Sequence, residues 1–469
     1  MRILNKLVNF NNKRIFLHKF LIILILFFIG LHHNEIHFDF ELNHNYLKLQ
    51  YELNLTFNNN LNNKINIAIY YNSIKNGGIE RLIALFLDYI SNINIFNTFL
   101  LTKKHKEKNE YPMPIKTKRI IVNQRNKNDL IKILNREKID ILIYNFYDYL
   151  EMKNLNNAKN TKTIYYNHSC FFIWIYSHFY YYYKTVYNEY RQSKYVISLV
   201  PFENDYLYKK WGINSILMNN FITYEYNSII PSDLSSKIIL MIGRGSDRLK
   251  RFDLGVESMK YIAKEIKDSK MKIISDFSYI DHLKESVIKL NLNNSIEFIG
   301  YSSTPEIYFK NASLHIFPSI CESFGLVLSE TKIFGIPNIV VGLEYVSIVK
   351  GGTIILYDDN SESIAKEAIK ILKDDNYRKK LGKEARKSMQ KFKNKLLLKK
   401  WIKLILAVYN GENYYLNLRK EDEKLPENES LTILNRQVEL LKMRIPNFTK
   451  ITIKDIENFT YMKNLEKIF

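Results

Sequence analysis

Apolar residues along this chain fall into short runs that alternate with longer segments of helical spacing. The first run of the expected globular part is 64–71, and similar runs follow at 99–101, 139–144, 163–166 and 195–199. Short apolar runs predict buried strands, whereas apolar positions three to four residues apart, as in 79–90, predict a helix. The pattern therefore predicts alternating strands and helices to about residue 223.

A second series begins at residues 237–242 and continues through 272–275, 296–299, 314–317 and 339–341. Two such series predict an α/β fold with two doubly wound parallel-sheet, Rossmann-like domains, 64–223 and 224–400. Segments 361–372 and 376–391 have the spacing of amphipathic helices that close the second domain. Ligands of such sheets bind at the carboxyl ends of the strands, so we expect the site between the domains.

The end of the chain, residues 401–469, is expected to hold a crossing helix and a charged tail. The tail has a weak apolar spacing that can form one helix, at Leu431, Leu434, Val438 and Leu441. We assign it no chemistry.

The most apolar run lies near the beginning of the chain. Residues 20–31 are uninterrupted and apolar, and the run extends to residue 15 if His18 and Lys19 reach toward an interface. We predict a transmembrane signal anchor at 15–31, with a cleaved signal peptide as the alternative. Basic residues before the run place 1–14 in the cytoplasm, with a stem at 32–63. This predicts a type II single-pass membrane protein, in the endoplasmic reticulum or Golgi if the chain is eukaryotic.

The composition agrees with two domains and limits the classes of binding partner that we expect. The chain has 469 residues, 46% of them hydrophobic, which is enough for two ordinary cores. Its formal net charge of +21 would suit nucleic acid, yet Lys, Asn, Ile, Tyr and Phe are abundant throughout, and no zinc-finger spacing or RNA-binding aromatic signature occurs. We therefore expect no nucleic-acid partner, and an anionic membrane surface suits the charge better.

Cysteines and glycosylation sequons leave the compartment open. Cys170 and Cys321 can pair or remain free thiols. Sequons that would suit a lumenal domain begin at Asn54, Asn167, Asn311, Asn428, Asn447 and Asn458. In so Asn-rich a chain, many of these sequons are accidental.

The strongest chemical signal is the segment 321–330, which carries Glu322 and Glu330 eight positions apart. It follows the predicted strand 312–317, and a helix is predicted to begin near Gly325. A helix N-terminus directly after a parallel strand offers free N–H groups to an anion such as a diphosphate. Glu322 then lies beside that anion, and Glu330 can accept hydrogen bonds from vicinal hydroxyls such as those of a ribose.

Three further clusters follow predicted strands. The first, Asn-Gly-Gly-Ile-Glu-Arg at 76–81, opens a helix, and its glycines let the backbone approach a phosphate or sugar. In the second, Gly243 precedes several cations that suit a diphosphate: Arg244, Arg248, Lys250 and Arg251. The third is His168 within Asn-His-Ser. Taken singly, each has a plain structural explanation, as a turn, a solvated basic loop or a structural histidine.

As a set, these motifs resemble the retaining nucleotide-sugar glycosyltransferases of family 4, which have the two-domain GT-B architecture. The resemblance covers about 64–410 and rests on the order of the motifs: Gly-Gly-x-Glu-Arg, a His after a strand, Gly-Arg with a downstream Lys, and Glu-x-Phe-Gly-Leu with a second Glu. It implies an enzyme that transfers a hexose from a nucleotide-diphosphate sugar to a glycan or lipid-linked acceptor with retention of configuration.

The resemblance also implies a role for each site residue. Glu322 faces the donor hexose, Glu330 holds the ribose, and Arg244 and Lys250 neutralise the diphosphate, with Arg248 as the alternative to Lys250. The expected catalytic residues are Glu322, His168, Arg244 and Lys250. The other expected donor contacts are Gly78, Tyr301 beside the base, and the backbone of Phe324, Gly325 and Leu326.

The sequence also bears on the mechanism. No Asp-x-Asp motif occurs, and the cations can do a metal's electrostatic work, so we expect transfer without a metal or another cofactor. No second carboxylate needs to act as a nucleophile, which favours front-face transfer in which the leaving diphosphate helps accept the acceptor's proton. Thr331 and Lys332 stand where the family has alanines, which puts the packing of that helix in question.

Two alternatives stay open. A catalytically inactive GT-B subunit that binds a sugar or joins a complex would keep the fold, and a basic nucleic-acid binder would be indifferent to nucleotide sugars. The motifs do not identify the donor sugar, the nucleotide or the acceptor.

Overall fold

The computed structural model describes residues 64–444, apart from 76, 109, 146–150, 152–153, 156–157, 159, 173–186, 245–247, 277–279, 421 and 423–424. The anchor predicted at 15–31 and the stem at 32–63 lie outside the described residues and stay predictions. Within the described ranges, no helix combines the length and apolar character needed to cross a bilayer.

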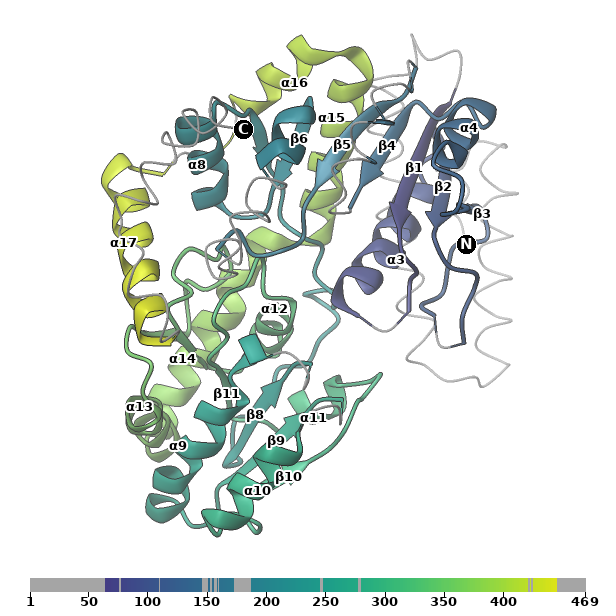
Figure 1. Ribbon diagram of the computed structural model, residues 1–469. Helices are drawn as coiled ribbons and strands as arrows, with labels where there is room; N and C mark the ends of the chain where they lie inside the picture. Colours follow the sequence, from purple (N-terminus) through teal and green to yellow (C-terminus); the bar gives the residue numbers. More distant parts are fainter. Residues whose placement is uncertain are drawn as a thin grey trace, which may run out of the picture. The chain divides into compact units, whose positions relative to one another are not determined.

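The first sheet has seven strands, all parallel, in the order β3-β2-β1-β4-β5-β6-β7 (Figure 1). Its strands are β1 (Ile65–Tyr71), β2 (Phe96–Thr102), β3 (Lys118–Ile121), β4 (Ile141–Tyr144), β5 (Lys162–Tyr166), β6 (Tyr195–Ser198) and β7 (Ser215–Leu217). Every residue of β4 and β6 is buried, as expected for a parallel sheet with both faces covered. The covering helices include α3 (Gly78–Ser91), α4 (Asp129–Arg136) and α8 (Pro201–Trp211).

The second sheet has six parallel strands in the order β10-β9-β8-β11-β12-β13 (Figure 1). Its strands are β8 (Ile238–Ile242), β9 (Lys270–Ile274), β10 (Ile296–Phe298), β11 (Leu314–Phe317), β12 (Asn338–Val341) and β13 (Thr353–Leu356). The helical elements are η2 (Arg248–Lys250), α9 (Phe252–Glu265), α10 (Asp281–Lys289), α11 (Glu306–Phe309), α12 (Leu326–Ile333), α13 (Ser361–Lys373), α14 (Asp375–Ser388) and η3 (Met389–Phe392). Two parallel-sheet α/β domains are thereby confirmed.

Each sheet reverses its strand order once. The reversal lies between β1 and β4 in the first sheet and between β8 and β11 in the second. Connections that leave neighbouring strands in opposite directions open a crevice at their carboxyl ends, which is where such sheets bind ligands. The loop after β1 leads to Gly78, the loop after β8 carries Arg244 and Lys250, and the loop after β11 carries Glu322.

Helix α15 (Asn394–Asn410) returns the chain to the first sheet. Lys162 on β5 donates a hydrogen bond to the backbone oxygen of Tyr409 at 2.6 Å. At the start of the helix, the side chain of Asn394 accepts from the backbone N–H of Ile222 and donates to its carbonyl, both at 2.8 Å. One buried amide thus joins the two segments that pass between the sheets.

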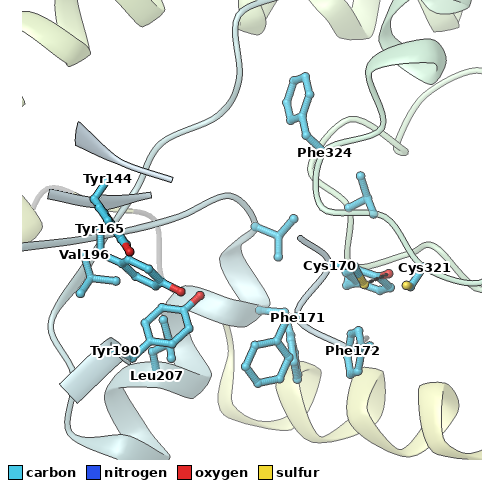
Figure 2. Packing of buried hydrophobic residues seen from close by; sticks show 14 of the residues in the cluster. Tyr144, Tyr165, Cys170, Phe171, Phe172, Tyr190, Val196, Leu207, Cys321 and Phe324 are labelled. Carbon is cyan, nitrogen blue, oxygen red and sulfur yellow. Dashed lines mark hydrogen bonds between the residues drawn. The ribbon is translucent and has the colours of Figure 1, made fainter. Parts of the chain in front are cut away.

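A continuous buried cluster contains side chains from both sheets' connecting loops (Figure 2). The Phe172 ring meets the Tyr345 ring edge-on, with centroids 4.8 Å apart. Cys170 and Cys321 are buried free thiols in this cluster, and the Cys170 Sγ lies 3.4 Å from the hydroxyl oxygen of Tyr345. Burial raises the pKa of the Cys321 thiol, and the neighbouring Cys170 adds to the rise.

The tail forms two helices, α16 (Glu412–Arg419) and α17 (Glu427–Arg444), which confirms that the apolar spacing in the tail is helical. Of the predicted positions, Leu434 and Val438 are buried, whereas Leu431 is 46% exposed. Ile433 and Leu440 are buried in addition.

Candidate functional site

Helix α12 begins directly after the loop that follows β11. Gly325 precedes it with φ of 78°, in the left-handed region that glycine adopts without strain. The Phe324 side chain is fully buried and packs edge-on against Phe392, with ring centroids 6.0 Å apart. Its side chain belongs to the core, so the loop can meet a ligand there only through its backbone. The first N–H groups of α12 have no partners within the helix and favour an anion.

Lys250 and Glu322 form an ion pair beside this helix start. Lys250 Nζ lies 2.5 Å from Oε1 of Glu322, and Ser319 Oγ donates to the same oxygen at 2.7 Å. The Ile320 N–H donates to the Leu249 carbonyl at 2.7 Å, which joins the loops after β8 and β11. Both charged side chains are mostly buried, at 19% and 12% exposed. Screening by solvent is therefore limited, and the pair fixes a cation and a carboxylate at the point where the strand order reverses.

Two side chains of the first domain donate hydrogen bonds to Glu330. Glu330 lies in α12 and is only 4% exposed. Its Oε1 accepts from Arg81 Nη1 at 3.1 Å and from Thr223 Oγ1 at 2.7 Å. Burial raises the pKa of Glu330, whereas the Arg81 charge and the Thr223 hydrogen bond oppose the rise. The sequence assigns Arg81 no role, although its position at the end of the Gly-Gly-x-Glu-Arg motif is a signal that could have singled it out.

Gly78 is the first residue of α3 and lies against the start of α12. A Cβ atom added to Gly78 would sit 3.1 Å from Cδ1 of Leu326, closer than an ordinary contact. The absence of a side chain therefore lets the two helix starts approach each other. Both offer N–H groups without helical partners at the same place.

Arg244 follows β8 and its side chain is exposed. Burial raises the pKa of both Tyr71 and Glu80, and the positive charge of Arg244 opposes the rise in each case. The guanidinium therefore acts on two ionisable groups of the first domain. The side chain of Arg248, the expected alternative to Lys250, lies outside what the structure describes.

His168 lies at the carboxyl end of β5. Its Nε2 is 3.0 Å from Oδ1 of Asn145, and its ring centroid is 4.0 Å from that of Tyr166. Burial lowers the pKa of His168 to about 3, so the imidazole is neutral at ordinary pH. Among the described residues, its Nδ1 has no hydrogen-bond partner.

His168 also lines a mainly apolar pocket in the first domain. Its walls are Ile69, Leu82, Ile83, Phe86, Ile143, Asn145, Tyr166, His168, Asn220, Phe221 and Trp401. The structure brings His168 together with Asn145 and this pocket. Its hydrogen bond to Asn145 and its ring contact with Tyr166 do not involve Lys250 or Glu322.

Tyr301 follows β10 and is 56% exposed. Burial raises the pKa of Tyr111 to about 12, and Tyr301 adds to the rise. Because Tyr111 lies between β2 and β3, this interaction places Tyr301 close to the first domain. Tyr111 also interacts with Arg81, the ion-pair partner of Glu330.

Thr331 and Lys332 explain how α12 packs without alanines. Thr331 Oγ1 hydrogen-bonds Asn338 Oδ1 at 2.9 Å. Lys332 Nζ donates to the backbone oxygens of Ile348, Val349 and Lys350, the last two at 3.1 and 2.9 Å. Burial lowers the pKa of Lys332 to about 7. Both side chains thus tie the helix to neighbouring elements.

Chemically, the arrangement offers a fixed ammonium, an exposed guanidinium and two helix starts to an anion, with Glu322 and Glu330 beside them. In the ranges that the structure describes, no group of three or more His, Cys, Asp or Glu side chains is placed to hold a metal ion.

Comparisons with known proteins extend this description. Residues 225–388 match the family described as "Glycosyl transferases group 1". The chain is 24% identical over 254 residues to the poly(glycerol-phosphate) alpha-glucosyltransferase of Bacillus subtilis, which covers 53% of this chain and 34% of that protein. It is 24% identical over 161 residues to the poly(ribitol-phosphate) alpha-N-acetylglucosaminyltransferase of Staphylococcus aureus, which covers 33% of this chain and 32% of that protein. The matches thus span about a third of each relative's length.

Solved structures share the fold. Sucrose-phosphate synthase from Thermosynechococcus elongatus has a TM-score of 0.63 at 15% identity, with 74% of this chain and 100% of that chain covered. A mutant of S. aureus TarM, in complex with fondaparinux, alpha-GlcNAc-glycerol and UDP, has a TM-score of 0.61 at 15% identity, with 74% and 100% covered. Anabaena HepE with UDP and glucose has a TM-score of 0.58 at 14% identity, with 73% and 100% covered. Residues 225–388 therefore resemble the glycosyl transferases group 1 family, and the described chain shares its two-domain fold with solved structures of the GT-B kind.

Proposed function

We propose that this chain is a glycosyltransferase that moves a hexose from a nucleotide-diphosphate sugar to a glycan or lipid-linked acceptor, with retention of configuration and without a metal ion. The observation that carries the proposal is the Lys250–Glu322 ion pair at the start of α12, within the segment 225–388 that matches the glycosyl transferases group 1 family. A cation, a carboxylate and free N–H groups meet there at a strand-order reversal.

In this proposal the diphosphate binds at the start of α12. Lys250 and Arg244 supply positive charge, and charge stabilisation of a leaving diphosphate is the largest expected contribution to catalysis. Glu322, held by Lys250 and Ser319, faces the hexose, and Glu330 accepts hydrogen bonds from the ribose. Gly78 lets the start of α3 approach the same phosphates. Tyr301 lies beside the base.

Transfer then needs no covalent enzyme intermediate. The bond between the anomeric carbon and the diphosphate oxygen breaks, and the acceptor hydroxyl attacks from the same face of the sugar. The hydroxyl proton passes to the departing diphosphate. In this proposal the two glutamates position the donor, with Glu322 paired with Lys250 and Glu330 with Arg81. His168, neutral and bound to Asn145, is assigned a hydrogen bond to the sugar.

The names of the relatives indicate which acceptors to test. Their names include glycerol-phosphate and ribitol-phosphate polymers and 2-deoxystreptamine, all of which present hydroxyl groups. Two of those names specify alpha-linked transfer, which agrees with retention if the donor is alpha-linked. Polyol-phosphate polymers therefore join glycans and lipid-linked sugars as acceptors to be tested.

A binding panel followed by a transfer assay tests the proposal. UDP, GDP and ADP, each with and without glucose or N-acetylglucosamine attached, are screened by thermal shift. A donor at 100 times its dissociation constant adds about 2.7 kcal/mol to the free energy of unfolding. We expect one nucleotide series to stabilise the protein and its sugar to be transferred. A protein that binds a donor but neither transfers nor hydrolyses it would instead be the inactive GT-B subunit.

A separate experiment tests whether transfer needs a metal ion. The transfer rate is measured after treatment with EDTA and again after Mg²⁺ or Mn²⁺ is restored, and we expect these rates and the untreated rate to agree within about twofold. Strict loss of transfer with EDTA and recovery with metal would overturn this part of the proposal.

A further inference from the structure

Arg81 links the first domain to a carboxylate of the second. It lies in the first turns of α3, and its Nη1 is 3.1 Å from Oε1 of Glu330 in α12, 249 residues away along the chain. The side chains are 29% and 5% exposed. An ion pair this little exposed is screened weakly and holds its geometry better than a surface pair.

The surroundings of Glu330 show why it depends on that partner. Thr223 supplies one neutral hydrogen bond to the same Oε1, and Glu306 of α11 acts on Glu330 with a like charge. Burial and Glu306 both favour the protonated acid, so Arg81 is the principal group that keeps the carboxylate ionised. A protonated acid would accept fewer hydrogen bonds from a ribose.

Arg81 is itself held in place. Its guanidinium carbon lies 5.6 Å from the ring centroid of Tyr224, whose hydroxyl donates to Oε2 of Glu306 at 2.8 Å. Tyr111 also interacts with the Arg81 charge. The titratable groups that act on the pair are thus Tyr111 in the β2–β3 loop, Tyr224 after β7 and Glu306 on α11, and Thr223 adds a neutral hydroxyl.

We infer that Arg81 is a positioning residue for donor binding, which acts by holding Glu330 ionised and aimed at the ribose. The inference rests on the proposed function, because it assigns Glu330 to the nucleotide. The first domain thereby controls a contact that the second domain makes with the nucleotide. Arg81 needs no contact with the donor to do this.

The test is a double-mutant cycle on nucleotide affinity. UDP is the probe, with GDP and ADP as substitutes if the wild type prefers them, and dissociation constants are measured by calorimetry at about pH 6 and about pH 9. The variants are Arg81→Met, Glu330→Gln and the double variant. Each variant's dissociation constant is divided by that of wild type at the same pH. This ratio removes the effect of protonation of the nucleotide's own phosphate.

The expected results follow from the protonation of Glu330. Removing Arg81 raises the pKa of Glu330 further, so the acid is protonated at lower pH and recovers its charge as pH rises. The Arg81→Met variant should bind about tenfold more weakly than wild type at pH 6, the effect of one pKa unit, and within about threefold at pH 9. The double variant should bind no more weakly than Glu330→Gln, because Arg81 acts through Glu330. Arg81→Lys should restore most of the affinity at pH 6.

Controls separate this result from damage to the fold. Lys118 on the edge strand β3 forms another ion pair of the first domain, with its Nζ 2.6 Å from Oε2 of Glu137. The Lys118→Met variant should leave affinity unchanged. An Arg81→Met effect that is equal at both pH values, or that adds to that of Glu330→Gln, would overturn the inference and indicate direct contact or a purely structural role. So would wild-type affinity in Arg81→Met. A wild type that binds none of the three nucleotides would instead overturn the proposed function.

Discussion

At the scale of single residues, charged side chains of this site form ion pairs that fix their positions. Lys250 is close enough to Glu322 to fix it, and Arg81 does the same for Glu330. Each cation thereby has a structural partner besides any role toward a diphosphate. A substitution at one member changes the position or protonation of the other.

Lys250→Met should lower transfer far more than it lowers stability. The variant removes a charge that stabilises the leaving diphosphate and releases Glu322, so kcat/KM should fall by about 100-fold or more. The measurement is steady-state transfer from the donor that the binding panel identifies. Lys264→Met, at an exposed lysine in the last turn of α9, should leave kcat/KM within about twofold of wild type. An unchanged kcat/KM in Lys250→Met would contradict the assigned role.

Lys332 should make stability depend on pH. Burial lowers its pKa to about 7, whereas the unfolded value is about 10.4. Between these values the folded state binds fewer protons than the unfolded state, so stability from this group rises with pH. The free energy of unfolding of wild type, relative to Lys332→Met, should increase by at least about 1.4 kcal/mol from pH 7 to pH 10 in urea titrations. A flat difference would mean that the backbone carbonyls keep the lysine charged.

At the scale of elements, the sequence predicts buried strands well and edge strands poorly. The central strands β4, β6 and β11 are buried along their whole length and read as apolar runs. The unpredicted strands β3, β7 and β13 all lie at sheet edges. Each has only three or four residues, and β3 and β13 are only partly buried, so their sequences carry little periodicity.

The junction between α15 and the segment after β7 should be a stability determinant. Asn394→Ala would leave the N–H and carbonyl of Ile222 without partners in a buried setting, at a cost of about 1–3 kcal/mol for each group. Unfolding in urea should show a loss of about 3 kcal/mol. Asn410→Ala, at the exposed end of the same helix, is the control and should change stability by less than about 0.5 kcal/mol. Equal effects of the two substitutions would contradict this account.

At the scale of the whole described chain, the tail helix α17 joins elements that are distant in sequence. Ser430 Oγ donates to Oδ2 of Asp205 on α8 at 2.7 Å, and the Gln437 side chain donates to the carbonyl of Gly342 after β12. Val438 is fully buried in the same core cluster as the loop that carries Phe324. Helix α17 (Glu427–Arg444) is therefore part of the folded molecule.

Val438→Asp should destabilise the folded chain by more than about 2 kcal/mol, because an acid in an apolar core lacks hydrogen-bond partners. The comparison is Leu431→Asp, on the same helix but 46% exposed, for which we expect a change of about 0.5 kcal/mol or less. Thermal unfolding of both variants against wild type is the measurement. If the two variants melt together, α17 does not support the core.

The sequence by itself determined the alternation of strands and helices, the helix start at Gly325 and the polar groups at strand ends, because these depend on local periodicity and turn chemistry. It also placed Glu322 and Lys250 in loops that meet, since neighbouring parallel strands end at one edge. Only the tertiary structure decided that Arg81 pairs with Glu330 and that His168 is neutral. Ion pairing and burial depend on which surfaces the folded chain brings together, and no local pattern records a contact across 249 residues.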